Sequence, residues 1–139
     1  MLLNYVSRTY RKVVNRVLAA RGLSDSQALP IIMIGRLGGG VRLGVLAEQV
    51  GVEVPSLVRQ IDQLCAAGLA ERQDDPTDRR AKVISLTEAG RAQAEEIEAL
   101  FVEVRSRMLK QVGDDDLATA LKVLRGFEAT LQGDTADRG

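Results

Sequence analysis

Five residues near the start and along one side of a predicted helix over residues 54–67 have side chains suited to contact a nucleic acid. They are Pro55, Ser56, Arg59, Gln60 and Gln63. Guanidinium and carboxamide groups form paired hydrogen bonds with base edges, so we expect Arg59 to contact guanine and Gln60 to contact adenine or phosphate. Ser56, at the helix start, is suited to hold phosphate. The alternative is a surface helix whose polar side is merely solvated.

A second group of candidate residues lies in the charged stretch 74–82, at the tip of a predicted β-hairpin. It comprises Asp78, Arg79, Arg80 and Lys82. Adjacent arginines on an exposed tip suit the narrow minor groove of DNA, whose negative potential attracts guanidinium groups. Asp78 is placed to hold Arg79 or Arg80 in an extended rotamer, which would reduce the entropy lost on binding. The alternative is a solvated turn of mixed charge.

The net charge of the chain is zero, but its charges are unevenly distributed. Residues 1–82 carry 12 Lys and Arg against 8 Asp and Glu, whereas residues 83–139 carry 7 against 11. A locally basic region can bind a polyanion in a neutral protein, because the field at the contact face sets the attraction. Such segregation also arises by chance, so it supports the two motifs without replacing them.

The spacing of apolar residues predicts six helices. Gly22 ends the first, and Ser24 and Gln27 are spaced as a capping box at the start of the second, with Pro30 near its first turn. The polar residues 133–139 are expected to form a disordered tail. The predicted helices cover residues 2–22, 24–37, 43–50, 54–67, 87–112 and 114–132.

Two short strand-like segments, residues 69–73 and 83–86, flank the charged stretch and predict the hairpin. The element order is then α-α-α-α-β-β-α-α, so we expect a mostly α-helical protein with a small β-wing. Two short helices followed by a hairpin are typical of a winged helix-turn-helix, which we place at residues 23–86.

The residues offer no set suited to catalysis or metal binding. The chain has no His, one Cys, no Gly-rich phosphate loop and no metal-ligand cluster. We therefore expect no enzymatic activity, no cofactor and no metal. No apolar run is long enough to span a membrane, and the first residues lack a signal-peptide pattern. With Cys65 as its single cysteine, the chain forms no internal disulfide, which is typical of the reducing cytoplasm.

Several spaced motifs in register resemble the MarR family, and especially its SlyA branch. The similarity covers nearly the whole chain in helix order and is most specific over residues 43–90. The motifs are Leu46-Ala47-Glu48-Gln49-Val50-Gly51-Val52, Pro55-Ser56-Leu57-Val58-Arg59, Asp62-Gln63-Leu64, Gly68-Leu69-Ala70-Glu71-Arg72, Asp78-Arg79-Arg80-Ala81-Lys82 and Leu86-Thr87-Glu88.

The resemblance implies a homodimeric transcriptional regulator, in the usual case a ligand-responsive repressor. Residues 1–22 and 87–132 would form the helical dimerisation region, although their apolar stripes also suit a single-chain bundle. Two-fold symmetry implies binding to double-stranded DNA at a pseudo-palindromic operator, with half-sites about one helical turn apart.

The resemblance also implies a crevice for a small aromatic carboxylate or phenolic effector, between the dimerisation helices and the DNA-binding lobe. Arg8 and Arg11 align with positions that face this crevice, where a guanidinium could pair with a carboxylate. An exposed basic helix face or intersubunit salt bridges are the alternatives for these arginines. Ala28 stands where SlyA-like proteins often have a bulky aromatic residue that lines the crevice.

Two alternative functions stay open at the level of sequence. A winged helix can serve protein–protein contact without a DNA target, although such a role gives no reason for the paired arginines Arg79 and Arg80. A thiol-based redox-sensing regulator is the other alternative. Cys65 lies on the apolar side of its helix, where a buried and inert thiol is expected.

Overall fold

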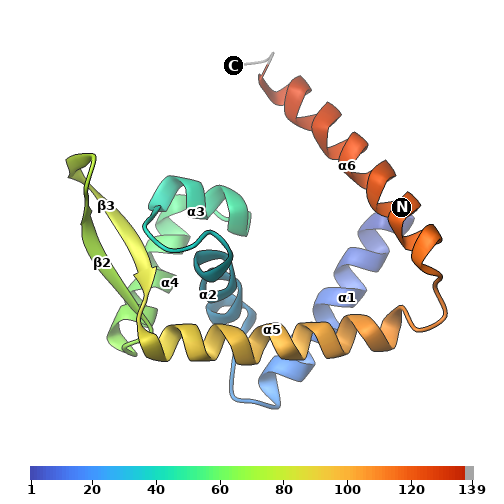
Figure 1. Cartoon of the computed structure of the whole chain (residues 1–139), viewed down its shortest axis with the longest axis horizontal. Helices are drawn as coiled ribbons and strands as arrows, with labels where there is room; N and C mark the ends of the chain where they lie inside the picture. The colour runs from blue at the N-terminus through green and yellow to red at the C-terminus, as the bar shows by residue number, and fades with distance from the viewer. Residues whose placement is uncertain (137–139) are drawn as a thin grey trace. The chain divides into compact units, whose positions relative to one another are not determined.

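The computed structural model describes residues 1–136, and the side chains of residues 1–133. The chain divides into two compact units, Met1–Val104 and Arg105–Gly139. Its elements, labelled in Figure 1, are α1 (Leu2–Ala19), α2 (Asp25–Arg36), β1 (Val41–Arg42), α3 (Leu43–Val50), α4 (Val54–Ala66), β2 (Ala70–Asp75), β3 (Asp78–Leu86), α5 (Glu88–Met108) and α6 (Asp114–Ala136). The predicted fold class, mostly helical with a small β-wing, is confirmed. The two-residue strand β1 was not predicted, because so short a strand exists only through pairing with β3.

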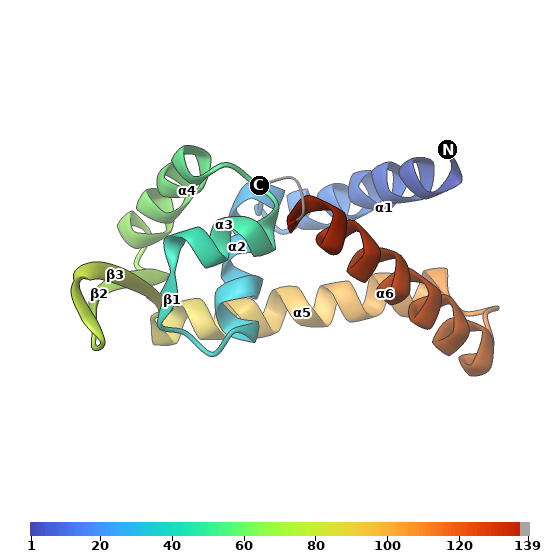
Figure 2. The same cartoon turned by 90° about the horizontal axis from the view of Figure 1, so that it is seen from above.

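The sheet is antiparallel with the strand order β1-β3-β2. The prediction of a long charged loop over residues 74–82 was wrong. Both strands run on through the polar residues, so only Pro76 and Thr77 form the turn between Asp75 and Asp78. Backbone pairing in a hairpin does not need apolar side chains, and here it extends the ribbon beyond the apolar segments from which the strands were predicted. In both views the ribbon lies at the end of the first unit opposite α1 (Figures 1 and 2).

The register of the ribbon changes near its tip. Asp75 lies opposite Asp78, whereas the preceding residue Asp74 lies opposite Lys82. The residues 79–81 are therefore extra residues on β3 without partners in β2. Such a bulge bends a strand and redirects its side chains.

The core of the first unit is aliphatic. The stripe Leu57, Ile61 and Leu64 predicted on α4 is fully buried, as the apolar periodicity required. Half-buried Cys65 packs against this core as a small hydrophobe. Other fully buried side chains, from five further elements, are Leu18, Ile31, Ile34, Leu46, Ile84 and Ile97.

The start of α2 differs from the prediction. Ser24 precedes the helix, but its hydroxyl does not bond a helix amide; it donates to Gln27 Oε1 at 3.1 Å. The capping box is therefore absent in this region, since the two side chains satisfy each other. Pro30 lies in the second turn of α2, not the first, because the helix begins at Asp25. The first helix ends at Ala19, before Gly22.

The start of α5 is tied closely to the base of the wing. Thr87 Oγ1 accepts a hydrogen bond from the amide of Gly90 (3.1 Å) and donates one to the carbonyl of Gly68 (2.6 Å). Gly90 is buried, and a Cβ added there would lie 1.9 Å from the carbonyl oxygen of Leu69. Only glycine fits at this crossing. The helix ends at Met108, four residues before the predicted end at residue 112.

In the second unit, α6 begins at Asp114, as the acidic run predicted. It continues to Ala136, so residues 133–136, predicted as part of a disordered tail, are helical. No proline follows Gly133, and a glycine costs a helix only about 1 kcal/mol. The rest of the predicted tail, residues 137–139, lies outside the described residues. Every side chain of residues 114–133 is exposed, and among helices in the described part of the chain none is long and apolar enough to cross a membrane.

Candidate nucleic-acid interface

The outward face of α4 is set by the turn that precedes it and by the residues it buries. Gly51 ends α3 in a left-handed conformation (φ 76°), and Pro55 sits in the first turn of α4, where its missing amide costs little. With Leu57, Ile61 and Leu64 directed into the core, the opposite side of α4 must face solvent. The exposed residues there are Pro55, Ser56, Arg59 and Gln63.

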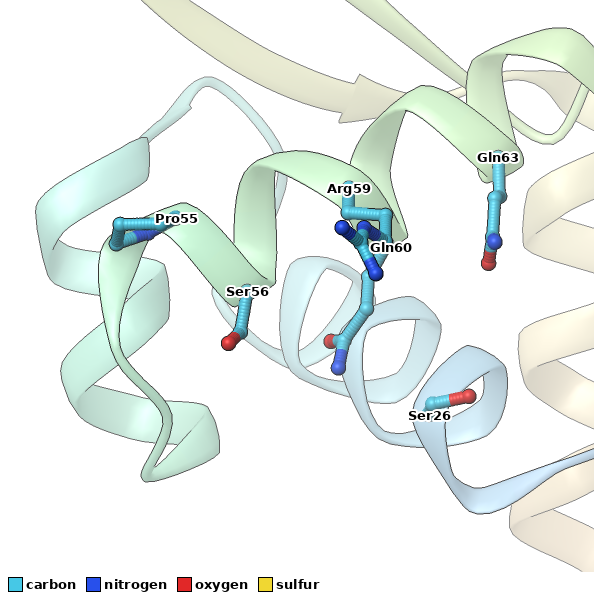
Figure 3. Close-up of a pocket in the computed structure, with 6 residues that line it drawn as sticks. All are labelled: Ser26, Pro55, Ser56, Arg59, Gln60 and Gln63. Carbon is cyan, nitrogen blue, oxygen red and sulfur yellow. The ribbon is translucent and has the colours of Figure 1, made fainter.

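These residues border a hollow beside α2. It measures about 400 Å³ and is lined by Ser26, Pro55, Ser56, Arg59, Gln60 and Gln63. Figure 3 shows the side chains of Ser56, Gln60 and Gln63 extending from α4 toward the side on which Ser26 of α2 lies. In the part of the chain that the structure describes, no hydrogen bond or ion pair occupies the side chains of Ser56, Arg59 and Gln63. Their donors and acceptors are free for a ligand.

Gln60 differs from its neighbours in burial. It is half-buried, and its Oε1 is enclosed without a hydrogen-bond partner among the described residues. An enclosed and unsatisfied amide oxygen is a polar group that gains from an incoming donor. The structure thus places Gln60 deeper in the hollow than Arg59, and less open to a duplex.

The bulge of β3 carries the two arginines predicted for the wing. Arg79 and Arg80 are both exposed, and the side chain of Arg80 is 97% exposed. Asp78 Oδ1 accepts a hydrogen bond from the backbone amide of Arg80 (3.0 Å) and lies 3.8 Å from Arg80 Nε. This is the arrangement in which the carboxylate would orient the guanidinium. Lys82 instead pairs with Asp74 on the neighbouring strand, so its ammonium group is already partly neutralised.

Ion pairs that the sequence prediction missed attach the wing to the rest of the lobe. Arg72 on β2 donates to Asp62 Oδ1 on α4 at 2.5 Å, which connects the base of the wing to the helix with the polar face. Arg42 and Asp75 form a second pair, nearer the tip. Each pair joins residues at least ten positions apart, and no local motif in the sequence indicates which charges meet.

The residues predicted for an effector crevice differ in their surroundings. Arg11 lines a cavity of about 150 Å³ with Tyr10, Leu29 and Phe101, and also a second one of about 470 Å³ that reaches α3 and α4. Arg8 is exposed and lines neither cavity. Ala28 is fully buried in the core and does not line them. Of the three predicted residues, Arg11 is the one that lines these two cavities of the described residues.

Fold and surface together define a winged helix-turn-helix protein with cations and amides on its outward helix and wing. A model of the MarR family matches residues 21–81, which span α2, β1, α3, α4, β2 and the start of β3. The chain belongs to the MarR family of winged-helix DNA-binding transcription regulators. This confirms the resemblance at the level of the family, and the SlyA branch stays a prediction.

Solved structures of other proteins match this fold over nearly the whole chain. The chain is 34% identical to transcriptional regulator PA3341, with 95% of this chain and 96% of that chain covered at a TM-score of 0.88. It is 26% identical to CouR from Rhodococcus jostii RHA1, solved with p-coumaroyl-CoA bound (91% and 88% covered, TM-score 0.81). A MarR mutant from E. coli in complex with operator DNA shares the fold at 23% identity (91% and 90% covered, TM-score 0.77).

Proposed function

We propose that this protein is a sequence-specific transcriptional regulator that binds a pseudo-palindromic operator as a homodimer. One observation carries the proposal: a single lobe holds both the free polar face of α4 and the exposed arginines of the β3 bulge. The Arg72–Asp62 pair joins α4 to β2, the strand that pairs with β3. An α-helix and an arginine-bearing wing are the two parts needed to read adjacent major and minor grooves.

Each side chain has a role in this proposal. Arg59 reads base edges in the major groove, helped by Gln63, and Gln60 contributes where the duplex approaches the hollow. Ser56, Pro55 and the backbone amides at the start of α4 hold phosphate. Arg80, oriented by Asp78, enters the minor groove, while Arg79 and Lys82 contact the backbone. The E. coli MarR mutant of the same fold, solved in complex with operator DNA, supports operator DNA as the ligand.

The homodimer is proposed from apolar surface that the chain leaves uncovered. On α6, the side chains of Leu121, Leu124 and Phe127 are 47%, 47% and 55% exposed, and on α1 Leu2 and Val6 are exposed as well. Apolar residues left exposed along a helix are typical of an interface. We accordingly assign residues 1–22 and 87–132 to dimerisation and residues 23–86 to DNA binding. The proposal includes no catalytic role and places the protein in the cytoplasm.

Control by a small molecule is part of the proposal. The 150 Å³ cavity combines the guanidinium of Arg11 with the rings of Tyr10 and Phe101, a lining suited to a small aromatic carboxylate or a phenol. CouR, which was solved with p-coumaroyl-CoA bound, supports an aromatic ligand class. Such a ligand would release DNA, and so act on a repressor, if it favours a dimer in which the two lobes are wrongly spaced.

Selection of binding sites from random duplexes tests the proposal. The full-length protein is incubated with a library of random double-stranded DNA at physiological salt, and the bound fraction is sequenced over several rounds. We expect enrichment of an inverted repeat whose half-sites are centred about one helical turn apart. Failure to enrich any sequence, or enrichment of a site without symmetry, would contradict the proposal.

A further inference from the structure

The carboxylate of Asp75 stands out among the charged groups of the described residues, because it alone is buried (5% exposed). It sits at the end of β2, one residue before the two-residue turn of the wing. A buried carboxylate is costly unless hydrogen bonds and an opposite charge satisfy it. Both oxygens of Asp75 have such partners, and the two sets of partners come from different parts of the chain.

Asp75 Oδ2 is held by Arg42. The Nε of Arg42 donates a hydrogen bond to this oxygen at 2.6 Å, and the Nη2 of Arg42 lies 2.5 Å from the same atom. Arg42 belongs to β1, lies opposite Val83 of β3 and immediately precedes α3. The ion pair therefore ties the outer end of β2 to the edge strand and to the helix-turn-helix.

Asp75 Oδ1 organises the turn. It accepts hydrogen bonds from the amide (2.8 Å) and the hydroxyl (2.7 Å) of Thr77. This is the local hydrogen bonding by which an aspartate stabilises a tight turn. Three hydrogen bonds and an ion pair lower the pKa of Asp75 to about 2, chiefly through the bonds from Thr77 and then Arg42.

We propose that Arg42 is a positioning residue for DNA binding, which acts through Asp75 to hold the β3 bulge, and hence Arg80, in the orientation that meets the minor groove. This inference rests on the proposed function. A projecting two-stranded ribbon is only marginally stable by itself, so its tip needs an anchor. If the tip samples several orientations, the affinity falls by the fraction of molecules with Arg80 in place.

The competing explanation is that Arg42 contacts DNA phosphate directly. Its side chain is 50% exposed, so exposure does not exclude this. Charge separates the two explanations. Arg42→Ala removes a positive charge, which weakens DNA binding under either explanation. Asp75→Asn removes a negative charge, which would strengthen binding to a polyanion unless the ion pair matters for position.

The experiment measures the dissociation constant for the duplex that the wild-type protein selects, at two salt concentrations. The variants are Arg42→Ala, Asp75→Asn and the control Arg36→Ala. Arg36 is matched to Arg42: its side chain is 49% exposed and lies 2.5 Å from a carboxylate, that of Glu98 on α5. We expect Arg42→Ala and Asp75→Asn each to weaken binding about tenfold, the size of effect given when an anchored state falls to a tenth of the population. Arg36→Ala should change it less than about twofold, as expected for an exposed pair.

A double-mutant cycle with Arg80→Ala distinguishes positioning from a general structural defect. If Arg42 acts by orienting Arg80, its replacement in an Arg80→Ala background should change affinity less than about twofold, because the oriented group is already gone. A tenfold loss in that background would overturn the proposal, as would an Asp75→Asn variant that binds as tightly as wild type. Melting temperatures of all variants identify any loss that comes from unfolding.

The experiments distinguish an error in the role assigned to Arg42 from an error in the proposed function. If wild-type protein selects no inverted repeat, the proposed function is wrong and the anchor has no DNA contact to position. If wild type selects its operator and Arg42→Ala binds it as Arg36→Ala does, the function stands and the positioning role of Arg42 is wrong.

Discussion

The winged lobe and α6 differ in how far their apolar residues are covered by the rest of the chain. In the lobe, the apolar face of α4 is covered by other elements of the same chain, down to zero exposure at Leu57, Ile61 and Leu64. On α6 the equivalent stripe is left open, with Leu121 and Leu124 nearly half exposed. The hydrophobic effect acts on both alike. The lobe thus completes its core within the chain, whereas the exposed stripe on α6 is the surface on which the proposed homodimer rests.

A second contrast, within the lobe, is between charged residues that form ion pairs and charged residues that do not. Charged groups of the lobe form ion pairs between elements, as in Arg72–Asp62 and Arg42–Asp75, whereas Arg59 and Arg79 are left without partners among the described residues. Exposed ion pairs contribute little stability, typically below about 1 kcal/mol each. Here the ion pairs link α4, β1 and the wing to one another, and the unpaired cations lie on the surface proposed to bind DNA.

The largest expected effect on stability comes from a substitution at Gly90, where α5 packs against the backbone of Leu69. Replacement Gly90→Ala would place a methyl group 1.9 Å from the carbonyl oxygen of Leu69, so backbone must move. We expect a loss of about 3 kcal/mol or more in the free energy of unfolding, measured by chemical denaturation at fixed protein concentration. The control is Gly44→Ala on α3, where nothing lies within 4 Å of the added atom. A loss below about 1 kcal/mol for Gly90→Ala would contradict the close contact.

Charging the open stripe should separate the chains and leave the lobe folded. In the variant Leu121→Glu, a carboxylate replaces an apolar group at the proposed interface, and we expect dimer dissociation to become about 100-fold easier, as at an interface hot spot. Sedimentation velocity over a range of concentrations measures this. Thr119→Glu, on another side of α6, serves as the control and should stay dimeric. A Leu121→Glu protein as dimeric as wild type would place the interface elsewhere.

Removing the wing arginine should weaken DNA binding without touching either core. We expect Arg80→Ala to reduce operator affinity about 10- to 100-fold, as for a well-placed charged contact.

Arg59→Ala should instead relax the preference for one base pair over the others, by about 1–3 kcal/mol at the base pair concerned. Fluorescence anisotropy with the selected duplex and its single-base variants measures both, with Arg21→Ala as an exposed control cation. Unchanged affinity of Arg80→Ala at moderate salt would refute the role of the wing.

The smallest effect concerns pH. The pKa of Asp75 is lowered from 3.8 to about 2 on folding, so its stabilisation is complete above pH 4 and is lost as pH falls through about 2. The difference in unfolding free energy between wild type and Asp75→Asn should therefore be constant from pH 7 to 5 and shrink between pH 4 and 2. The same difference at pH 6 and at pH 2.5 would show that the carboxylate is not the group held by Arg42 and Thr77.

Sequence patterns predicted the helices well where one face repeats every three to four residues. The helix over 43–50 was placed to the residue, and α4 within one residue, because their apolar stripes and the glycine between them are local features. The outward position of Arg59 follows from the same periodicity. These are the parts of the fold and site that depend only on neighbours along the chain.

What the sequence could not predict depends on pairings between distant residues. Strand β1 exists only because Val41 and Arg42 pair with β3, more than 40 residues later. Arg42 and Asp75 are 33 residues apart, and nothing in the local pattern selects that partner over the other arginines. The turn of the wing was predicted too long for the same reason, since strand ends are set by cross-strand pairing and not by hydropathy.

The central claim is that α4 and the wing of one lobe contact the same half-site, and directed DNA cleavage tests it most directly. Cys65 is the single cysteine, so a Cys65→Ala background allows an iron chelate to be attached at Gln63→Cys on α4 or at Arg79→Cys on the wing, with Arg59 and Arg80 intact. We predict cuts from both positions within each half-site, offset by about 5 base pairs and mirrored across the operator centre. Cuts from only one position, or from the two positions in unrelated parts of the duplex, would contradict the account.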